Sequence, residues 1–278
     1  MLKILVTGAN GFVGSHIVDE LYKNKHHILC PLRKTANLKW ISNLPVNFIY
    51  GDLNDDSFLK KIIVNIDIIV HCAGSVRAIT KNEYFSVNVG ITKKICETIL
   101  KMNYHKLKKI IFISSQAAMG PSISFNSIRK ATDIESPISD YGLSKLLAEH
   151  EIKKKLYGKI PYTILRPAAI YGPRDSDIFI FFKLINKHLK LVTFTKKMLQ
   201  LVYVKDVVNS VDDCIQNKKT DNNCYYIANS AMYSWGDVGR IISTSVNLKT
   251  IPIVIPDFVF KFIGMTSEFL SLFTKKKK

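Results

Sequence analysis

The chain has 278 residues, and its 40 Lys and Arg residues outnumber its 22 Asp and Glu residues, which gives a formal net charge of +18 at pH 7. A chain of this length can bury a substantial core and fits one large domain or a domain with a smaller lobe. The lysines occur in doublets, such as Lys60-Lys61, without interleaved aromatic residues. This pattern is typical of solvated helix ends and loops, so nucleic acid binding is not favoured.

The same bulk properties bear on location and metal content. The longest stretch without Asp, Glu, Lys or Arg, residues 110–128, contains Gln, Asn, Pro and several Ser residues, so the sequence predicts no transmembrane helix. The first predicted strand begins at residue 2, which leaves no room for a signal peptide. The five cysteines are scattered without paired spacing, which favours reduced thiols and argues against a zinc site. We therefore expect a cytoplasmic protein without a bound metal.

A glycine-rich turn follows the first predicted strand. Leu2–Val6 is a short apolar run typical of a buried parallel strand, and the pattern over Phe12–Tyr22 suits a helix. Gly8 permits the tight turn, Gly11 lets the backbone approach a pyrophosphate, and Gly14 lets the helix lie close to the strand. The dinucleotide-binding residues predicted in this turn are Gly8, Asn10, Gly11, Phe12, Val13 and Gly14.

The second predicted strand, His27–Leu32, bears on the choice of cofactor. In a dinucleotide fold the end of this strand meets the adenine ribose, where an acidic residue binds the 2′-hydroxyl of NAD and an Arg accommodates the 2′-phosphate of NADP. Arg33 follows the strand directly, and no Asp or Glu occurs between Leu29 and Asp52. The sequence therefore favours NADP, with Arg33 as its phosphate ligand, although Arg33 as a plain surface cation is the alternative.

Two further strands and a long helix come next. Val46–Tyr50 and Ile66–His71 are apolar runs of strand length, and Glu83–Met102 has the pattern of one continuous helix. Small residues follow the second of these strands, where they would let a nucleotide lie against the carboxyl ends of the strands. These predicted cofactor-binding residues are Cys72, Ala73 and Gly74.

Polar residues that suit acid–base chemistry follow the fifth predicted strand, Lys109–Ser115. Tyr141 and Lys145 lie four positions apart in a helix that Ser139 or Asp140 could cap, so their side chains share one helix face. An ammonium beside a phenol favours the phenolate and lowers the Tyr pKa from its ordinary value of about 10. A general acid–base group near neutral pH needs such a shift.

Several sequence blocks resemble those of the extended short-chain dehydrogenases/reductases, the superfamily of nucleotide-sugar epimerases, dihydroflavonol reductases and 3β-hydroxysteroid dehydrogenases. The blocks are Thr7-Gly8-x-x-Gly11-x-x-Gly14, Asn88-Val89-Gly90-Ile91-Thr92, Ser114-Ser115-Gln116-Ala117-Ala118-Met119-Gly120, Tyr141-x-x-x-Lys145 and Arg166-Pro167-Ala168-Ala169-Ile170-Tyr171-Gly172-Pro173-Arg174. The resemblance covers residues 1–210 well. It is nearest to dihydroflavonol-reductase-like members, in which a stretch similar to Leu32–Leu38 cradles the 2′-phosphate of NADP.

The resemblance implies a catalytic role for three residues. Ser115 would orient the substrate oxygen, Tyr141 would exchange its proton, and Lys145 would hold the cofactor ribose and lower the pKa of the phenol. Gln116 and Arg174 are the residues that the resemblance places toward the substrate. The dehydratase branch of the superfamily has Thr-Asp-Glu where this chain has Ser114-Ser115-Gln116, which counts against sugar dehydration.

The resemblance also implies further cofactor contacts. Asp52 and Leu53 would lie beside the adenine, although Asp52 could also serve as a turn or cap residue. Asn88 is expected to be structural or adjacent to the cofactor, and Arg166 to be a buried structural cation. The remaining residues implied to contact the cofactor are Ser114, Pro167, Ala168 and Ile170, together with Tyr141 and Lys145 themselves.

The last third of the chain gives a weaker pattern. We expect a helix over Asp177–His188, a short strand and helix around Leu201–Val207, a strand over Cys224–Ala228 and a helix that begins near Ser234. The segment 256–273 is rich in Phe and Leu, and four lysines close the chain. We interpret this segment as a helix of the substrate lobe. A basic amphipathic helix on a membrane surface is the alternative that we do not favour.

Together these features predict an α/β fold with a doubly wound parallel sheet and a smaller C-terminal substrate lobe. Residues 1–166 would form the NAD(P)-binding Rossmann domain, and residues 167–278 the substrate-binding lobe, partly interleaved with the Rossmann core. The function expected is NADP(H)-dependent carbonyl reduction or alcohol oxidation at a Ser-Tyr-Lys site, with NAD(H) as the second cofactor choice. The cofactor would carry the hydride chemistry.

Two other functions remain open at this point. One is a nucleotide-sugar epimerase that oxidises and re-reduces its substrate with a retained NAD. The other is a cofactor-binding module without catalysis, against which the three residues Ser115, Tyr141 and Lys145 argue. The partner expected is a small molecule, either a carbonyl or alcohol compound or a nucleotide sugar, and a homodimer is allowed.

Overall fold

The computed structural model describes residues 1–102, 106–122, 129–130, 132–193 and 198–255. The chain divides into two compact units, each of which is described by itself. The first unit contains Met1–Ala168 and Val204–Ile227, and the second contains Ala169–Tyr203 and the chain from Ala228 onward. The chain therefore leaves the first unit after Ala168 and returns to it for one helix and one strand.

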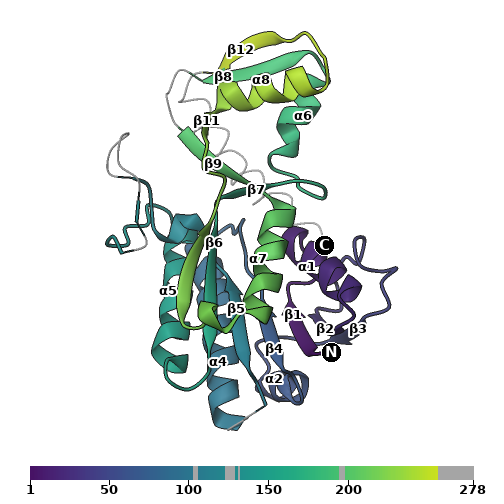
Figure 1. The fold of residues 1–278 in the computed structure, drawn as a ribbon, viewed down its shortest axis with the longest axis vertical. Coiled ribbons are helices and arrows are strands. Elements are labelled where there is room, and N and C mark those ends of the chain that lie inside the picture. Colours follow the sequence, from purple (N-terminus) through teal and green to yellow (C-terminus); the bar gives the residue numbers. More distant parts are fainter. Residues whose placement is uncertain (103–105, 123–128, 131, 194–197, 256–278) are drawn as a thin grey trace. The chain divides into compact units, whose positions relative to one another are not determined.

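The first unit is built on one seven-stranded parallel sheet with the order β10-β6-β5-β4-β1-β2-β3 (Figure 1). Its strands are β1 (Lys3–Thr7), β2 (His27–Leu32), β3 (Asn47–Tyr50), β4 (Ile68–His71), β5 (Lys109–Ile113), β6 (Tyr162–Pro167) and β10 (Asn223–Ile227). The strand order reverses between β1 and β4, which is the point where ligands bind in doubly wound sheets. The predicted fold class is confirmed.

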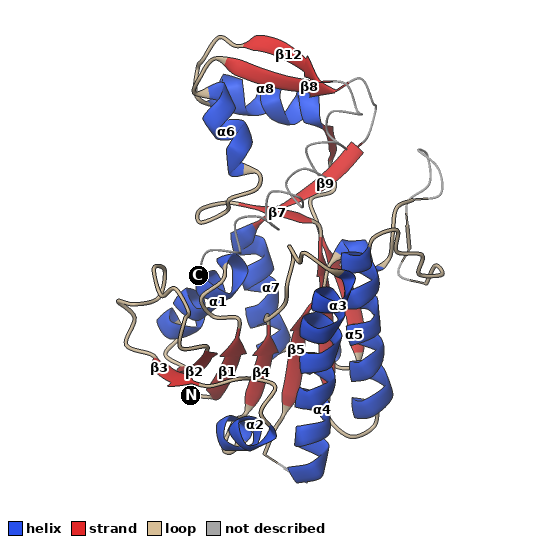
Figure 2. Ribbon diagram, turned by 180° about the vertical axis from the view of Figure 1, so that it is seen from behind, coloured by secondary structure: helices blue, strands red, loops and turns tan. Residues whose placement is uncertain are grey.

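Helices cover both faces of this sheet (Figures 1 and 2). One face packs against α1 (Phe12–Lys23) and α7 (Val204–Gln216), and the other against α2 (Asp56–Ile63), α4 (Ile91–Met102) and α5 (Asp140–Leu156). Successive residues of a strand pack on opposite faces of the sheet. Ile68 and Val70 lie in the core with α1 and α7, and Ile69 lies in the core with α2, α4 and α5. Burial on both faces explains why the strands read as continuous apolar runs.

The prediction of one continuous helix over Glu83–Met102 is wrong for Phe85–Gly90. The segment consists of α3 (Lys81–Tyr84), a π-helical turn over Phe85–Gly90, and α4. A π turn inserts an extra residue into the helix and is frequent at functional sites. The buried residue of this turn is Asn88, whose side chain is 2% exposed.

The second unit has its own small core. A three-stranded sheet is formed by β7 (Ala169–Tyr171), β9 (Met198–Tyr203) and β11 (Met232–Ser234), and a parallel pair by β8 (Leu189–Thr193) and β12 (Ile251–Ile255). Two helices, α6 (Phe179–Ile185) and α8 (Trp235–Ser245), contribute Phe181 and Trp235, whose rings stack at 4.7 Å. The predicted helix start near Ser234 is confirmed, and Ser234 caps α8. Two 3₁₀ turns in the first unit are η2 (Gln116–Ala118) and η3 (Lys218–Thr220).

Within these described ranges, no helix is both long and apolar enough to cross a membrane. The segment 256–278, with its expected lobe helix and its alternative as a membrane-surface helix, lies outside the described residues.

Lys109 fastens the returning segment Val204–Ile227 to the rest of the first unit. Its side chain is 5% exposed, and Nζ donates hydrogen bonds to Cys214 O at 2.8 Å and Thr220 Oγ1 at 3.0 Å. The same ammonium pairs with the carboxylate of Asp221. A cation at the carboxyl end of α7 also interacts favourably with the helix dipole. One buried side chain on β5 therefore holds the end of α7 in place.

We expect Lys109→Met to lower the free energy of unfolding by about 3 kcal/mol, because it leaves Asp221 and the carbonyls of α7 without their buried cation. Urea unfolding followed by circular dichroism measures the change. The adjacent Lys108 is 60% exposed and pairs with Asp67 on the surface, so Lys108→Met should cost less than about 1 kcal/mol. Equal losses in the two variants would contradict the anchoring role of Lys109.

Candidate active site

In the glycine turn between β1 and α1, Gly11 is the glycine whose backbone a pyrophosphate could approach. A Cβ added at Gly14 would lie 2.1 Å from Gly8 O, and one added at Gly8, where φ is +70°, would lie 2.7 Å from Ala73 N. A Cβ at Gly11 would instead meet Gly8 O at 3.3 Å, a contact that a small shift relieves. No side chain among the described residues caps the amino end of α1. The open backbone at Gly11 and the uncapped helix end fit the phosphates of a dinucleotide.

A buried chain of hydrogen bonds connects this turn to α4. Ala73 N donates to Thr7 Oγ1 at 3.1 Å, and Thr7 Oγ1 lies 2.7 Å from His71 Nδ1. His71 Nε2 lies 2.9 Å from Thr92 Oγ1, which donates to Asn88 O at 2.6 Å. Because the Thr92 proton is used on Asn88, Nε2 must donate and Nδ1 must accept the Thr7 proton. Burial lowers the pKa of His71 to about 3, so the ring stays neutral in this tautomer.

Asn88 uses its whole side chain to join two segments of the site. Oδ1 accepts from Ser75 N at 2.7 Å, and Nδ2 donates to Ser75 O at 3.0 Å and to Ser144 Oγ at 2.8 Å. Ser144 Oγ donates in turn to Tyr141 O at 2.8 Å. Asn88 therefore fixes the loop after β4 against the first turns of α5. This arrangement gives Asn88 a structural role, and its contact with a cofactor stays a prediction.

Ser115 and Tyr141 meet because the first turn of α5 lies directly on η2. Ser139 caps α5 by accepting from Gly142 N at 3.0 Å. A Cβ at Gly142 would lie 2.3 Å from Ala117 O, so only glycine allows this approach. The Ser115 hydroxyl lies near the Tyr141 phenol and lowers its pKa, against the larger effect of burial. The structure thus brings together two of the three residues predicted to be catalytic.

Lys145, the third of these residues, is 4% exposed. Its Nζ donates to Ile113 O at 2.8 Å and lies 4.8 Å from the centre of the Phe112 ring. Burial lowers its pKa to about 8 and raises the pKa of Tyr141 to about 12. The expectation that Lys145 lowers the pKa of Tyr141 is therefore wrong for the chain by itself, because removal of the phenol from water is the largest influence on its pKa and Lys145 does not offset it.

A buried ion pair between Arg166 and Glu149 contacts Ser114, the residue before Ser115. Arg166, predicted to be a buried structural cation, is 2% exposed and donates from Nη2 to Glu149 Oε2 at 2.6 Å. Glu149 is fully buried and also accepts from Ser114 Oγ. The sequence argument missed Glu149, although its spacing of four from Lys145 on the same helix was a usable signal. It also missed the role of His71, for which no local motif gave a signal, and that of Thr7, although Thr7 opens the glycine block.

Other predicted cofactor residues of the first unit lie near the same sheet edge or around it. Arg33 is exposed just after β2, and Asn10 Nδ2 donates to Asn37 O at 3.3 Å, which joins the glycine turn to the loop after β2. Asp52 Oδ1 accepts from Asn54 N at 2.9 Å, so Asp52 is a turn residue, as its alternative interpretation held. Leu53 packs against the core. Contacts of these residues with a cofactor stay predictions.

The predicted residues beyond β5 are divided between the two units. Gln116 begins η2, and Ala168, just after β6, donates from its backbone to Ile227 O at 2.9 Å. Ile170 lies in β7 of the second unit, and Arg174 lies in a turn of that unit with φ of +71°. The roles proposed for Ile170 and Arg174 toward cofactor and substrate stay predictions.

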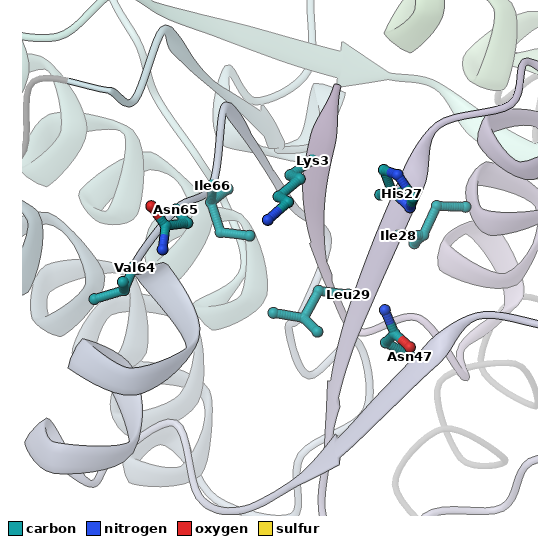
Figure 3. A pocket seen from close by; sticks show the side chains of 8 residues that line it. All are labelled: Lys3, His27, Ile28, Leu29, Asn47, Val64, Asn65 and Ile66. Atoms are coloured by element: carbon teal, nitrogen blue, oxygen red, sulfur yellow. The ribbon is translucent and has the colours of Figure 1, made fainter. Parts of the chain in front are cut away.

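A surface groove lies at the opposite, amino-terminal edge of the sheet (Figure 3). Lys3, His27 and Asn47, which begin β1, β2 and β3, contribute side chains to it, together with residues Val64 to Ile66 before β4. None of the residues predicted for catalysis or cofactor binding lines this groove. The candidate site therefore lies at the carboxyl edge of the sheet, and the groove is not part of it.

Comparison with known proteins gives consistent results. The family described as NAD dependent epimerase/dehydratase matches residues 4–228. A putative UDP-glucose 4-epimerase of Methanocaldococcus jannaschii is 31% identical over 220 residues, which are 74% of this chain and 71% of the relative. The UDP-glucose 4-epimerase of Vibrio cholerae is 25% identical over 272 residues, 94% of this chain and 81% of the relative. The crystal structure of a UDP-glucuronic acid 4-epimerase from Bacillus cereus with NAD has a TM-score of 0.78 at 24% identity, covering 92% of this chain and 87% of that one.

The geometry of the glycine turn predicts opposite effects for two similar substitutions. Gly11→Ala should leave the urea midpoint near that of the wild type but weaken dinucleotide binding roughly tenfold or more, because the methyl group enters the space that suits the phosphates. Gly14→Ala should lower the unfolding midpoint, because its methyl group overlaps Gly8 O. Isothermal titration calorimetry and urea unfolding separate the two effects. A Gly11→Ala variant with unchanged affinity would show that no phosphate lies there.

His71 should make the protein sensitive to mild acid. Its pKa in the folded chain, about 3, lies below the ordinary histidine value of 6.5, so as pH falls below 6.5 only the unfolded chain takes up a proton. Stability should then fall by about 1.4 kcal/mol per pH unit from this group. We expect His71→Gln to flatten the dependence of unfolding free energy on pH between pH 6.5 and 5. His150→Gln, at an exposed position of α5, is the control and should keep the wild-type slope.

Proposed function

This chain belongs to the NAD dependent epimerase/dehydratase family, and we propose that it is a nucleotide-sugar 4-epimerase that retains its NAD. It is an enzyme of the short-chain dehydrogenase/reductase superfamily. The observation that carries the proposal is the proximity of Ser115 to Tyr141, on the helix that also carries the buried Lys145, in a chain whose relatives include UDP-glucose 4-epimerases. The epimerase, the alternative at the level of sequence, thus replaces carbonyl reduction as the favoured function.

Inversion of a secondary alcohol makes specific demands on the site. The proton of the hydroxyl group and a hydride from its carbon must both leave and both return, the hydride to the opposite face. In this proposal Tyr141 exchanges the proton and Ser115 orients the oxygen. When bound, NAD⁺ supplies reversible hydride acceptance and a positive charge at the site.

The burial of the phenol gives this assignment a physical requirement. Because burial raises the pKa of Tyr141 to about 12, the residue is a proton donor in the chain alone. Removal of a proton from an alcohol needs the phenolate, which added positive charge near the phenol favours. Lys145, whose pKa burial lowers to about 8, is still largely an ammonium at neutral pH.

NADP-dependent carbonyl reduction is the second candidate function, and Arg33 favours it. The side chain follows β2, it is exposed, and no acidic residue occurs between Leu29 and Asp52 to bind an adenine ribose hydroxyl. An exchanging NADP(H) fits this strand end better than a retained NAD. The cofactor that the purified protein carries therefore separates the two functions.

We expect the freshly purified protein to release about one NAD per chain on denaturation, identified by mass spectrometry, because an epimerase regenerates its cofactor in each cycle. The holoenzyme should then interconvert UDP-glucose and UDP-galactose without added nucleotide. Tyr141→Phe is the matched variant, which should release the same amount of NAD but lose turnover by about 10²-fold or more. A protein that emerges empty and binds NADPH in preference to NADH would support the reductase and overturn the epimerase.

A further inference from the structure

We propose that the buried Glu149–Arg166 pair positions Tyr141 against Ser115, so that Glu149 is a positioning residue of the active site. The consequence for turnover rests on the proposed function, in which these two hydroxyl groups act on the substrate. The contact between α5 and the end of β5 is the feature that the pair controls. Neither Glu149 nor Arg166 needs to touch substrate or cofactor in this role.

The first argument is the shared face of α5. Tyr141, Lys145 and Glu149 are spaced four residues apart, so they project from the same side of the helix. Lys145 is 4% exposed and Glu149 0% exposed, which places this face against the interior of the first unit. A change in the position of Glu149 therefore moves the helix face that carries Tyr141 and Lys145, two of the predicted catalytic residues.

The second argument is the set of groups that Glu149 binds. Its Oε1 accepts from Ser114 Oγ at 2.5 Å and from Arg166 Nε at 3.0 Å, while Oε2 accepts from Arg166 Nη2 at 2.6 Å. Ser114 directly precedes Ser115, and Arg166 lies near the end of β6. One carboxylate thus connects α5 to the backbone segment that carries the Ser115 hydroxyl.

The third argument is that Arg166 reaches the neighbouring segments as well. Its Nη1 lies 3.8 Å from Met119 Sδ, beyond η2, and 3.3 Å from Tyr226 Oη on β10. Its Nη2 lies 3.4 Å from Glu135 Oε1, in the loop that leads into α5. The planar guanidinium has donors in fixed directions, so the pair sets orientation as well as distance.

The energetics of buried ion pairs explain why the charged pair Glu149–Arg166 indicates a role in positioning α5. A buried ion pair often contributes little to stability compared with apolar side chains of similar volume, because both charges must leave water. Loss of one partner, however, leaves an uncompensated charge in the interior. Apolar side chains could fill the space between α5 and β6, but they would leave Ser114 without its acceptor and the helix without directional contacts.

The test compares three variants of the full-length holoenzyme. Glu149→Gln removes the charge, Glu149→Leu/Arg166→Met replaces the pair with apolar side chains, and Ser114→Ala removes only the link to β5. Glu151→Gln is the matched control, because Glu151 lies on the same helix and pairs with Lys155 at 3.6 Å away from the site. The measurements are kcat and KM for UDP-glucose, the urea midpoint, and the ¹⁹F spectrum of 3-fluorotyrosine-labelled protein.

We expect the double variant to keep a wild-type urea midpoint while kcat falls roughly 10- to 100-fold at little-changed KM, since small misplacement of reacting groups has effects of this size. Glu149→Gln should lose both stability and kcat, Ser114→Ala should lower kcat less, and Glu151→Gln should change neither. A double variant that regains both stability and kcat would show that the pair is only structural and would overturn the proposal. If that variant does not fold, Ser114→Ala with unchanged kcat overturns it instead.

The ¹⁹F spectrum keeps this proposal separate from the proposed function. The Tyr141 resonance, assigned as the one missing from Tyr141→Phe, needs no substrate. It should shift or broaden in the double variant and in Ser114→Ala but not in Glu151→Gln. A wild type that turns over no nucleotide sugar would defeat the epimerase, whereas an unmoved Tyr141 resonance would defeat the positioning role of Glu149.

Discussion

The Glu149–Arg166 ion pair joins the segments on which the candidate site depends. Glu149 belongs to the helix that carries Tyr141 and Lys145, and Arg166 belongs to β6. Ser114 extends the connection to the end of β5. In a doubly wound sheet, residues at the carboxyl ends of different strands are brought to one edge by the fold, but the fold does not fix their mutual distances to a few tenths of an ångström. Directional contacts between buried charges supply that accuracy.

The sequence predicted the parts of the molecule that depend on local chemistry. The strands of the parallel sheet are buried on both faces, so they appear as apolar runs, and His27–Leu32 was located to the residue. The glycine turn, the cap at Ser139 and the pair of Tyr141 and Lys145 on one helix face each follow from spacing within a short segment. The doubly wound parallel sheet was predicted as a fold class and was confirmed.

The features that sequence reasoning missed depend on contacts between distant segments. The π turn at Asn88 interrupts a good helical pattern because Asn88 bonds to Ser75 and Ser144, which lie 13 and 56 residues away. The pKa of Tyr141 was expected to fall and instead rises, because it depends on how completely the fold removes the phenol from water. The π turn and the pKa of Tyr141 therefore cannot be derived from residue spacing within a short segment.

Burial acts on Tyr141 and Lys145 in the same chemical sense, since it favours the neutral form of each. It raises the pKa of the phenol to about 12 and lowers that of the ammonium to about 8. Added positive charge at the site lowers both values, and added negative charge raises both. Loss of the Tyr141 proton is therefore controlled by the charge of whatever occupies the site. Under the proposed function, an oxidised cofactor would supply positive charge beside the phenol, and its presence would favour removal of a proton from the substrate alcohol.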